Sequence, residues 1–390
     1  MQTFLSCDIA KSAVFSRIML NKIFGFLTLG FYRFWGKTHL RRMIWQSVSI
    51  NGDRLTYHGT AKELFIGFLI AMLLLAVLFG VVGVALQFMV YASPQLMGID
   101  QVFNIMFLAA FWQFARYRLW RYRLSRTSYR TVRFFQKGRA LVYSAKTMLW
   151  SVISLLTLGW AYPKLRAVQA DYQINNMAFG DKVFEFRGEV TSFFRIYLPL
   201  ILFWNSVILV GVFLYFNTGI FATMIDASQG LQPENPNVIL YSMGFYLLIA
   251  IIATILFIAA RVKEFNYTVD QTRFFGARFA SRLPIVEVFK IGLLAGFVNV
   301  LFFAAVGFVI YTGIAGNNEA MTFALFPLFI VYFILFDIIK YLYLFIPMLK
   351  LICRSVAVDK VGVLAEVAAS AHEAPTYGEG LADALDVGAF

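Results

Sequence analysis

Lysine and arginine are absent from three long windows of the chain, residues 63–115, 196–260 and 291–339. Each window has room for two helices of about 20 apolar residues, the length that crosses a bilayer, and for the loop between them. Basic residues are retained on the cytoplasmic side of a membrane. We therefore expect three membrane hairpins whose tips face outward, with both termini in the cytoplasm. Only 14% of the residues are charged, against about 25% in a soluble domain, which agrees with a multi-pass membrane protein.

The hydrophobic pattern predicts six spans, near residues 64–90, 102–115 with a further turn or two, 193–216, 238–260, 288–311 and 321–341. Two other apolar segments remain, 17–35 and 145–163, and the second has basic residues on both sides. The second also carries a polar stripe at helical spacing, Thr147, Ser151, Ser154 and Thr157. This pattern favours a helix that lies in the membrane plane or re-enters on the same side. The alternative, two further true spans and eight in all, stays open.

Both of these segments end in the same four residues, Leu27–Gly30 and Leu156–Gly159. Aromatic and basic residues follow, and then a short strand-like pattern, "INGDRLTYHG" at 50–59 and "AFGDKVFEFRG" at 178–188. Asn51-Gly52 is a strong signal for a two-residue hairpin turn, because both residues tolerate positive φ. Looser copies occupy 121–138 and 261–279. Isolated hairpins are marginal in water, so we hypothesise that the four pair into one small sheet under the bilayer.

These patterns predict an all-α polytopic membrane protein with small cytoplasmic β-hairpin insertions and internally repeated LTLG–hairpin–helix units. We expect an integral membrane domain at 1–354, with repeat units near 17–90, 102–140, 141–216 and 238–311 and a last span at 321–341. Residues 355–390 hold six acidic residues against Lys360. That composition predicts a flexible acidic cytoplasmic tail.

Residues 27–65 combine several further features. They contain LTLG, a Tyr-x-x-Trp from Tyr32 to Trp35, the pair Arg41 and Arg42, and "YHGTAKELF" from Tyr57 to Phe65. This combination resembles the YjgN-like bacterial inner-membrane proteins, most closely over residues 20–70. The second copy departs from it, because "WAYPKLRA" follows its LTLG. That family is a domain of unknown function, so the resemblance implies a bacterial inner-membrane location and neither a reaction nor catalytic residues.

Two groups of arginines are candidates for binding an anionic lipid or ligand. The first is Arg41, Arg42 and Arg54 near Glu63, for which a structural ion-pair network between hairpin and helix is the favoured alternative. The second is Arg121 and Arg123, in a segment where basic and aromatic residues alternate. Such a segment can bind nucleic acid. Beside a membrane span, however, it more often sets topology and contacts anionic headgroups, so we expect no nucleic-acid partner.

Polar residues inside or beside the predicted spans are the other candidates. Asp337 and Lys340 lie three residues apart, which favours a local pair at the membrane interface over a buried functional charge. Asn205 and Asn299 favour hydrogen bonds between helices. Gly292 and Gly296 form a GxxxG pattern, which predicts close helix packing either within the chain or between copies in a homo-oligomer.

Other chemistry is not indicated. The two cysteines lie at opposite ends of the chain and the three histidines are scattered, so we expect no disulfide framework, metal site or cofactor. Phosphate-binding, zinc-protease and nucleophile motifs are absent, so we expect a protein that is not an enzyme. The sequence favours a membrane-organising or lipid-interacting protein that acts through a basic cytoplasmic face on anionic phospholipids. The alternative is a small-molecule or ion transporter or channel built from repeats.

Overall fold

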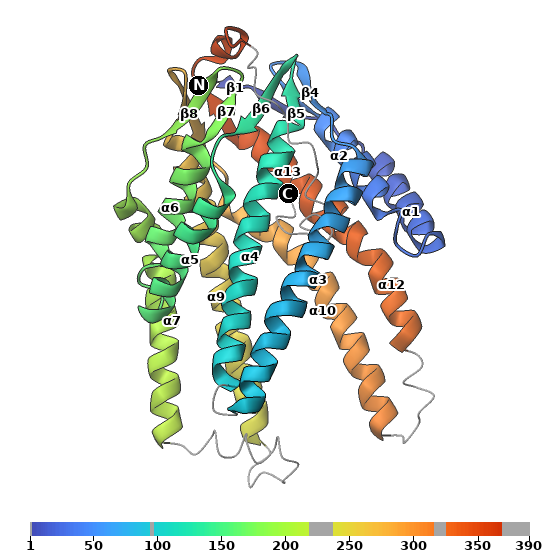
Figure 1. The fold of residues 1–390 in the computed structure, drawn as a ribbon, viewed down its shortest axis with the longest axis vertical. Coiled ribbons are helices and arrows are strands. Elements are labelled where there is room, and N and C mark those ends of the chain that lie inside the picture. The colour runs from blue at the N-terminus through green and yellow to red at the C-terminus, as the bar shows by residue number, and fades with distance from the viewer. Residues whose placement is uncertain (1, 94–96, 218–236, 316–324, 369–390) are drawn as a thin grey trace.

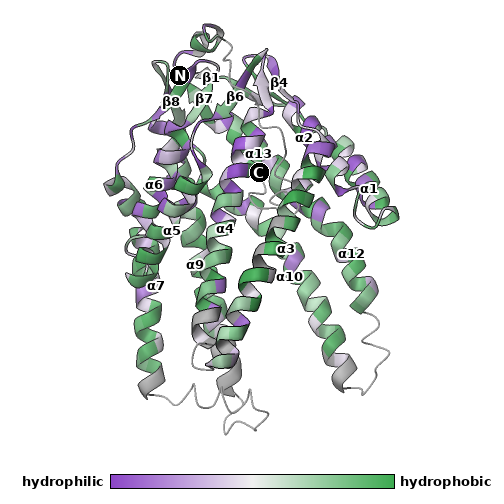
Figure 2. Ribbon diagram, viewed as in Figure 1, coloured by the Kyte–Doolittle hydropathy of each residue, from purple (hydrophilic) through white to green (hydrophobic). Residues whose placement is uncertain are grey.

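A β-sheet lies at one end of the molecule, and long helices extend from it in the opposite direction (Figure 1). The computed structural model describes residues 2–93, 97–217, 237–315 and 325–368. The long helices are apolar over most of their length, whereas polar residues gather at the sheet and at the helix ends next to it (Figure 2). This distribution agrees with the windows that lack basic residues.

The same order of elements occurs twice: a pair of helices, a β-hairpin, two long helices and a second β-hairpin. Two short strands come first, β1 (Gln2–Thr3) and β2 (Leu5–Cys7). The first set then comprises α1 (Lys11–Leu27), α2 (Arg33–Gln46), β3 (Val48–Ile50), β4 (Asp53–Tyr57), α3 (Ala61–Ala92), α4 (Met97–Ser125), β5 (Thr127–Tyr129) and β6 (Val132–Gln136). The second set comprises α5 (Ala140–Leu156), α6 (Tyr162–Asn175), β7 (Met177–Phe179), β8 (Lys182–Phe186), α7 (Val190–Asn217), α9 (Asn237–Asp270), β9 (Thr272–Phe274) and β10 (Ala277–Ser281). The chain then continues through α10 (Ile285–Ala315), α12 (Leu325–Ile338), a π-helical segment (Ile339–Phe345), α13 (Ile346–Ser355), β11 (Val356–Val358) and a 3₁₀ turn (Val361–Ala365).

The four hairpins pair edge to edge, as hypothesised, but the result is larger than a set of insertions. Eleven strands form one antiparallel sheet in the order β1-β11-β10-β9-β8-β7-β6-β5-β4-β3-β2. The N-terminal segment touches both ends of this sheet, because Gln2 pairs with Val358 of β11 and Leu5 pairs with Ile50 of β3. The sheet therefore curls into a nearly closed barrel. The prediction of an all-α protein with small hairpin insertions is therefore wrong. Each hairpin can be predicted from its local sequence, but the hydrogen bonds that join one hairpin to the next depend on the tertiary fold.

Aromatic rings fill the barrel. Phe179 is 1% exposed and lies at the centre of a cluster with Tyr129, Phe134 and Phe274. Successive strands supply these rings from the positions that alternate inward, the period expected of a strand with two unlike faces. Val363, Leu364 and Val367, from the segment after β11, pack against the same cluster. The first part of the predicted tail, up to Val367, therefore packs on the barrel, and residues 369–390 lie outside the described residues.

The LTLG motifs form the turns between paired helices. In the first, Leu29 and Gly30 have φ of 50° and 89°, and in the second Leu158 and Gly159 have φ of 49° and 92°. The Gly30 amide donates to the Gly25 carbonyl at 2.7 Å, a C-terminal helix cap that favours glycine. Thr28 Oγ1 donates to the Phe24 carbonyl and accepts from the Tyr32 amide, which joins the two helices. Neither apolar segment is therefore a continuous helix long enough to cross a bilayer.

Each turn exposes an apolar tip. Phe26 is 84% exposed, Leu29 is 91% exposed and Leu155 is 78% exposed. Behind the first tip, α1 and α2 pack antiparallel, with Asn21 Nδ2 donating to the Gly36 carbonyl at 3.1 Å. Apolar side chains this exposed suit contact with lipid, which agrees with a helical hairpin that enters and leaves the membrane on one side.

Five helices are long and apolar enough to cross a membrane, judged by length and composition over the described residues: Ala61–Met89, Val190–Leu214, Gly244–Asp270, Ile285–Ile310 and Leu325–Ser355. Five of the six predicted spans lie in them. The sixth, near 102–115, lies in α4, which is long enough but carries arginines from Arg116 onward. Because β4 pairs with β5, the chain that leaves the sheet through α3 must return to it through α4. If α3 crosses the membrane, α4 must cross it too.

Truncating the central ring of the barrel tests the importance of this core. We expect Phe179→Ala to lower the free energy of unfolding by about 3–5 kcal/mol, because it leaves a cavity where rings from several strands meet. Thermal unfolding in detergent, followed by circular dichroism, measures the change. Phe275→Ala is the control: this ring is 47% exposed and its neighbour is the Lys182 ammonium, 4.8 Å from the ring centroid. Its loss should cost less than about 1 kcal/mol. Equal losses in the two variants would contradict the account.

Candidate functional site

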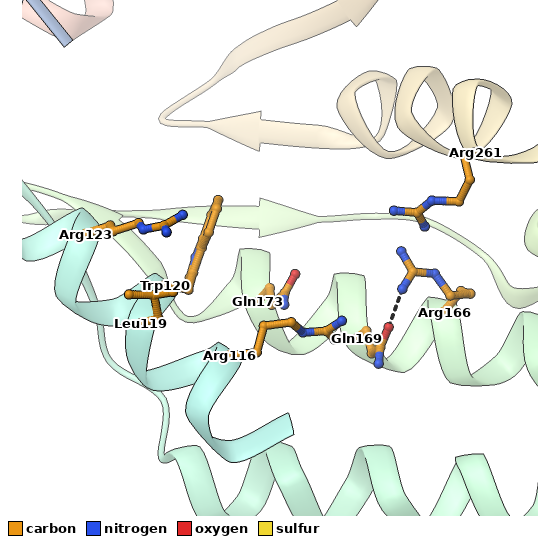
Figure 3. A pocket seen from close by; sticks show the side chains of 8 residues that line it. All are labelled: Arg116, Leu119, Trp120, Arg123, Arg166, Gln169, Gln173 and Arg261. Carbon is orange, nitrogen blue, oxygen red and sulfur yellow. Dashed lines mark hydrogen bonds between the residues drawn. The ribbon is translucent and has the colours of Figure 1, made fainter. Parts of the chain in front are cut away.

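A polar cavity of about 210 Å³ lies where α4, α6 and α9 meet below the sheet (Figure 3). Four of its eight lining side chains are arginines from three different helices, and the full set is Arg116, Leu119, Trp120, Arg123, Arg166, Gln169, Gln173 and Arg261. A single water needs only about 10–15 Å³ of such volume, so the cavity has room for a larger polar group.

Helix periodicity explains why these side chains share the cavity. Arg116 and Arg123 lie seven residues apart on α4, which is two turns, so both face the same side. Arg166, Gln169 and Gln173 follow the three- and four-residue spacing of one face of α6. Arg261 approaches from α9, on the side of the cavity where Arg166 lies (Figure 3). The three helices are held together at this level because each is continuous with, or next to, a strand of the barrel.

Glu264 of α9 is the carboxylate that binds the arginines on this side. Its Oε1 lies 2.8 Å from Arg166 Nη2, its Oε2 lies 2.5 Å from Arg261 Nη1, and Tyr197 Oη donates to it as well. Its side chain is 7% exposed. Burial is the largest single effect and lowers the pKa of Arg166, but the charge and hydrogen bond of Glu264, together with Tyr197 and Tyr162, outweigh it and raise the pKa. The guanidinium therefore stays charged at any physiological pH.

Arg116 is held differently. Its Nη2 donates to Tyr143 Oη at 2.7 Å, and Gln173 Nε2 donates to the same oxygen at 3.0 Å. The Arg116 Nε is buried and has no hydrogen-bond acceptor within the described ranges. The group is thus oriented by a neutral hydroxyl. Four guanidinium groups line the cavity, and two of them share the Glu264 carboxylate. Guanidinium groups bind phosphate or carboxylate through paired N–H donors.

The structure separates the arginines that the sequence grouped as ligand candidates. Arg123 lines the cavity, whereas Arg121, two residues away on the same helix, is exposed. Arg54 is exposed on β4. Arg41 and Arg42 lie on α2, where the Arg42 Nη2 donates to the Gly59 carbonyl at 3.0 Å.

Glu63 forms a structural ion pair. It accepts from Arg126 Nε at 3.0 Å and from Tyr122 Oη at 2.9 Å, which ties the start of α3 to the end of α4. The sequence grouped Glu63 with Arg41, Arg42 and Arg54, whereas the ion pair that the structure shows for Glu63 is with Arg126.

The cavity arginines that sequence reasoning missed are Arg116, Arg166 and Arg261. The sequence does mark two of them: Arg116 and Arg261 are the first basic residues after the windows 63–115 and 196–260, which lack lysine and arginine. Arg166 carries no comparable signal, because only the tertiary fold brings this residue of α6 to Glu264 of α9.

The intramembrane polar candidates mostly fasten the helical hairpins and the spans. Asp337 on α12 binds Lys22 of α1 at 2.7 Å, a partner that sequence spacing could not reveal. The Lys340 ammonium lies 5.6 Å from the centroid of the Tyr341 ring. Asn205 on α7 donates to the carbonyl of Leu158, in the second LTLG turn. Asn299 accepts from Tyr332 Oη at 2.5 Å, a hydrogen bond between α10 and α12 that agrees with its predicted role.

Of the two glycines in the GxxxG pattern, only Gly292 lies close to another helix of the chain. A Cβ at Gly292 would lie 3.9 Å from Ile258 of α9, and one at Gly296 would meet no heavy atom within 4 Å. The described residues contain no group of three or more histidine, cysteine, aspartate or glutamate side chains that could hold a metal ion.

Removing the Glu264 charge tests whether the arginines need their counterion. We expect Glu264→Gln to destabilise the fold by about 3 kcal/mol, because breaking a buried ion pair leaves its partners uncompensated. Thermal unfolding in detergent measures the change. Glu185→Gln is the matched control, because Glu185 forms an exposed pair with Arg187 and should leave the transition unchanged. A variant of Glu264 as stable as the control would contradict this role.

Comparison with known proteins gives a family for the chain. No curated protein and no solved structure matches it. The model of one family, described as bacterial protein of unknown function (DUF898), matches residues 10–384. That match covers nearly the whole sequence and agrees with the resemblance carried by the LTLG segment. The chain, five of whose described helices are long and apolar enough to cross a membrane, belongs to this family of bacterial proteins of unknown function.

Proposed function

We propose that this protein binds an anionic phospholipid headgroup in the cavity between α4, α6 and α9, on the cytoplasmic side of the bacterial inner membrane. The observation that carries the proposal is the convergence of Arg116, Arg123, Arg166 and Arg261 on one cavity. The role is one of binding and membrane organisation, and no chemical step is assigned to it.

The position of the arginines along the helices supports a lipid ligand. Arg116 and Arg261 directly follow apolar windows, so in a membrane they would lie at the level of the lipid phosphates. Trp120 lines the same cavity, and tryptophan is enriched at this interface. A headgroup could therefore reach the cavity while its acyl chains stay among the spans.

The charge balance supports an anion. Arg166 and Arg261 share the Glu264 carboxylate, and Arg116 has a neutral partner and a buried Nε without an acceptor among the described residues. A guanidinium binds phosphate through paired N–H donors, which adds geometric fit to the electrostatic attraction.

We also infer that the two sets of elements are an internal repeat and that the sheet faces the cytoplasm. Both sets place a helical hairpin, a β-hairpin and two long helices in the same order, and LTLG recurs at the same place in each. The basic residues outside the spans lie on the sheet side of the molecule, which is the distribution expected of a cytoplasmic face.

Transport receives less support. The polar side chains discussed in the spans, Asn205, Asn299 and Asp337, are engaged in hydrogen bonds or an ion pair within the chain. A transporter commonly places polar groups where they can bind a solute near the bilayer midplane.

Topology can be tested with single cysteines in a background that carries Cys7→Ser and Cys353→Ser. Asp181→Cys, at the exposed β7–β8 turn, should react with an impermeant maleimide only after the cells are permeabilised. Ser93→Cys, at the far end of α3, should react in intact spheroplasts. Labelling of Asp181→Cys from outside would contradict the cytoplasmic orientation of the sheet.

Lipid binding can be tested by native mass spectrometry of the protein purified in mild detergent. We expect an anionic phospholipid to be retained and the double variant Arg116→Gln, Arg261→Gln to bind it about 30-fold more weakly, since each interfacial arginine contributes roughly 1 kcal/mol.

The matched control is Arg54→Gln, Arg121→Gln, which removes the same charge from exposed positions outside the cavity. Its affinity should stay within about threefold of the parent protein, because exposed charges are largely screened. Equal losses in both double variants would mean that binding depends on net charge alone and would overturn the assignment to the cavity. Retention of a water-soluble solute in place of lipid would favour transport.

A further inference from the structure

The chain has two cysteines, Cys7 and Cys353, and the fold brings them into contact from opposite ends of the sequence. Cys7 is the last residue of β2 and pairs with Val48 of β3. Cys353 lies in the last turn of α13, which packs against β2. The two thiols lie close enough for each to affect the acidity of the other. Sequence spacing could not predict this pair, because its members are separated by almost the whole chain.

The surroundings hold the two segments in register. The Lys350 ammonium, one turn before Cys353 on α13, donates to the Ile9 carbonyl at 3.2 Å, two residues beyond Cys7. On the other side, Cys7 Sγ lies 3.8 Å from Ser47 Oγ. Apolar side chains that include Ile9 and Ile346 pack beside the pair. The contact between the cysteines is thus part of a packed junction.

The two thiols differ in access and in acidity. Cys7 is half-buried, whereas Cys353 is 3% exposed. The pKa of the Cys7 thiol is lowered, first because Cys353 donates a hydrogen bond to it, against an opposing effect of burial, with further contributions from Ser47 and Lys350. A thiolate is the reactive form of cysteine, so the accessible member of the pair is also the more nucleophilic one.

We propose that Cys7 and Cys353 are a redox site that forms a reversible intramolecular disulfide when a peroxide reaches the membrane surface. The Cys7 thiolate attacks one oxygen of hydrogen peroxide; an S–O bond forms, the O–O bond breaks, and the hydroxide that leaves takes up a proton to become water. The Cys353 sulfur then attacks the resulting sulfenic acid at Cys7. An S–S bond forms, the S–O bond breaks, and the leaving hydroxide takes the Cys353 proton. Two thiols are oxidised and one peroxide is reduced to two waters.

The Cys7–Cys353 disulfide would stabilise the closed form of the barrel. β1 and β2 belong to one N-terminal segment that pairs with β11 on one side and with β3 on the other. A covalent link from Cys7 to α13 fixes this segment to the helix that leads directly into β11. The disulfide therefore locks the closed sheet without changing which strands are paired.

The test uses the full-length wild-type protein, reduced in detergent micelles and then freed of reductant. After hydrogen peroxide treatment the protein is denatured and reacted with a maleimide-linked polymer that adds visible mass to each free thiol. We expect two additions in the reduced protein, none after oxidation and two again after dithiothreitol. The intact mass of the oxidised chain should fall by two hydrogen atoms, and a proteolytic digest should contain the Cys7 and Cys353 peptides joined.

Two variants define the roles of the pair. In Cys353→Ser, the Cys7 sulfenic acid cannot be resolved and should be trapped by dimedone. In Cys7→Ser, the buried Cys353 should stay alkylatable after the same peroxide treatment. The proposal is overturned if both wild-type thiols remain alkylatable, if Cys7 proceeds to sulfinic acid without a link, or if the cross-link joins two chains. None of these outcomes depends on lipid binding, so the test is independent of the proposed function.

Discussion

Backbone hydrogen bonds between neighbouring β-hairpins are the constraint on which the rest of the structure depends. Strands of three to five residues are too short to be stable as separate hairpins. The ladders β4–β5, β6–β7 and β8–β9 join them, and the β10–β11 and β1–β11 ladders complete the sheet. Apart from β1–β11, each of these ladders connects the strand before a set of helices with the strand after it. The sheet thereby fixes both ends of every helical excursion.

In this arrangement the sheet that joins the helices, rather than packing of the helices on one another, sets where the long helices lie. The apolar windows of α3 and α10 are only 7% and 6% buried within the chain, so these helices gain little from packing on one another. Most of their surface is left for lipid, and their spacing is set at the sheet. The cationic cavity lies at this junction because the helix ends are brought together there, with the arginines that follow the apolar windows.

Much of the local structure could be predicted from the sequence, but the closure of the sheet into a nearly complete barrel could not. Asn51-Gly52 and the alternation in residues 182–187 predict hairpins because turn and strand preferences are local. β1 and β11 are two and three residues long and carry no turn signal of their own, so only the finished sheet defines them. The same limit applies to Lys22 and Asp337, whose pairing depends on how α1 packs against α12.

The sequence predicted that arginines would form the candidate site, but it identified only one of the four arginines that line the cavity. Arg123 was identified together with Arg121, although two residues along a helix point about 200° apart, since each residue turns the helix by about 100°. Helical geometry alone could have paired Arg123 with Arg116. Arg166 and Arg261 needed the tertiary contact through Glu264, which no spacing rule supplies.

The position of β1 has a consequence for how the molecule is made. Residues 2–3 leave the ribosome long before residues 357–358, with which they pair. β2 can join β3 as soon as the first helical pair has formed, and each later hairpin can add to the edge that the previous one left. One edge of the growing sheet thus stays open through the insertion of all the long helices. Pairing across so large a sequence separation is slow, so the barrel can close only as the last step of assembly in the membrane.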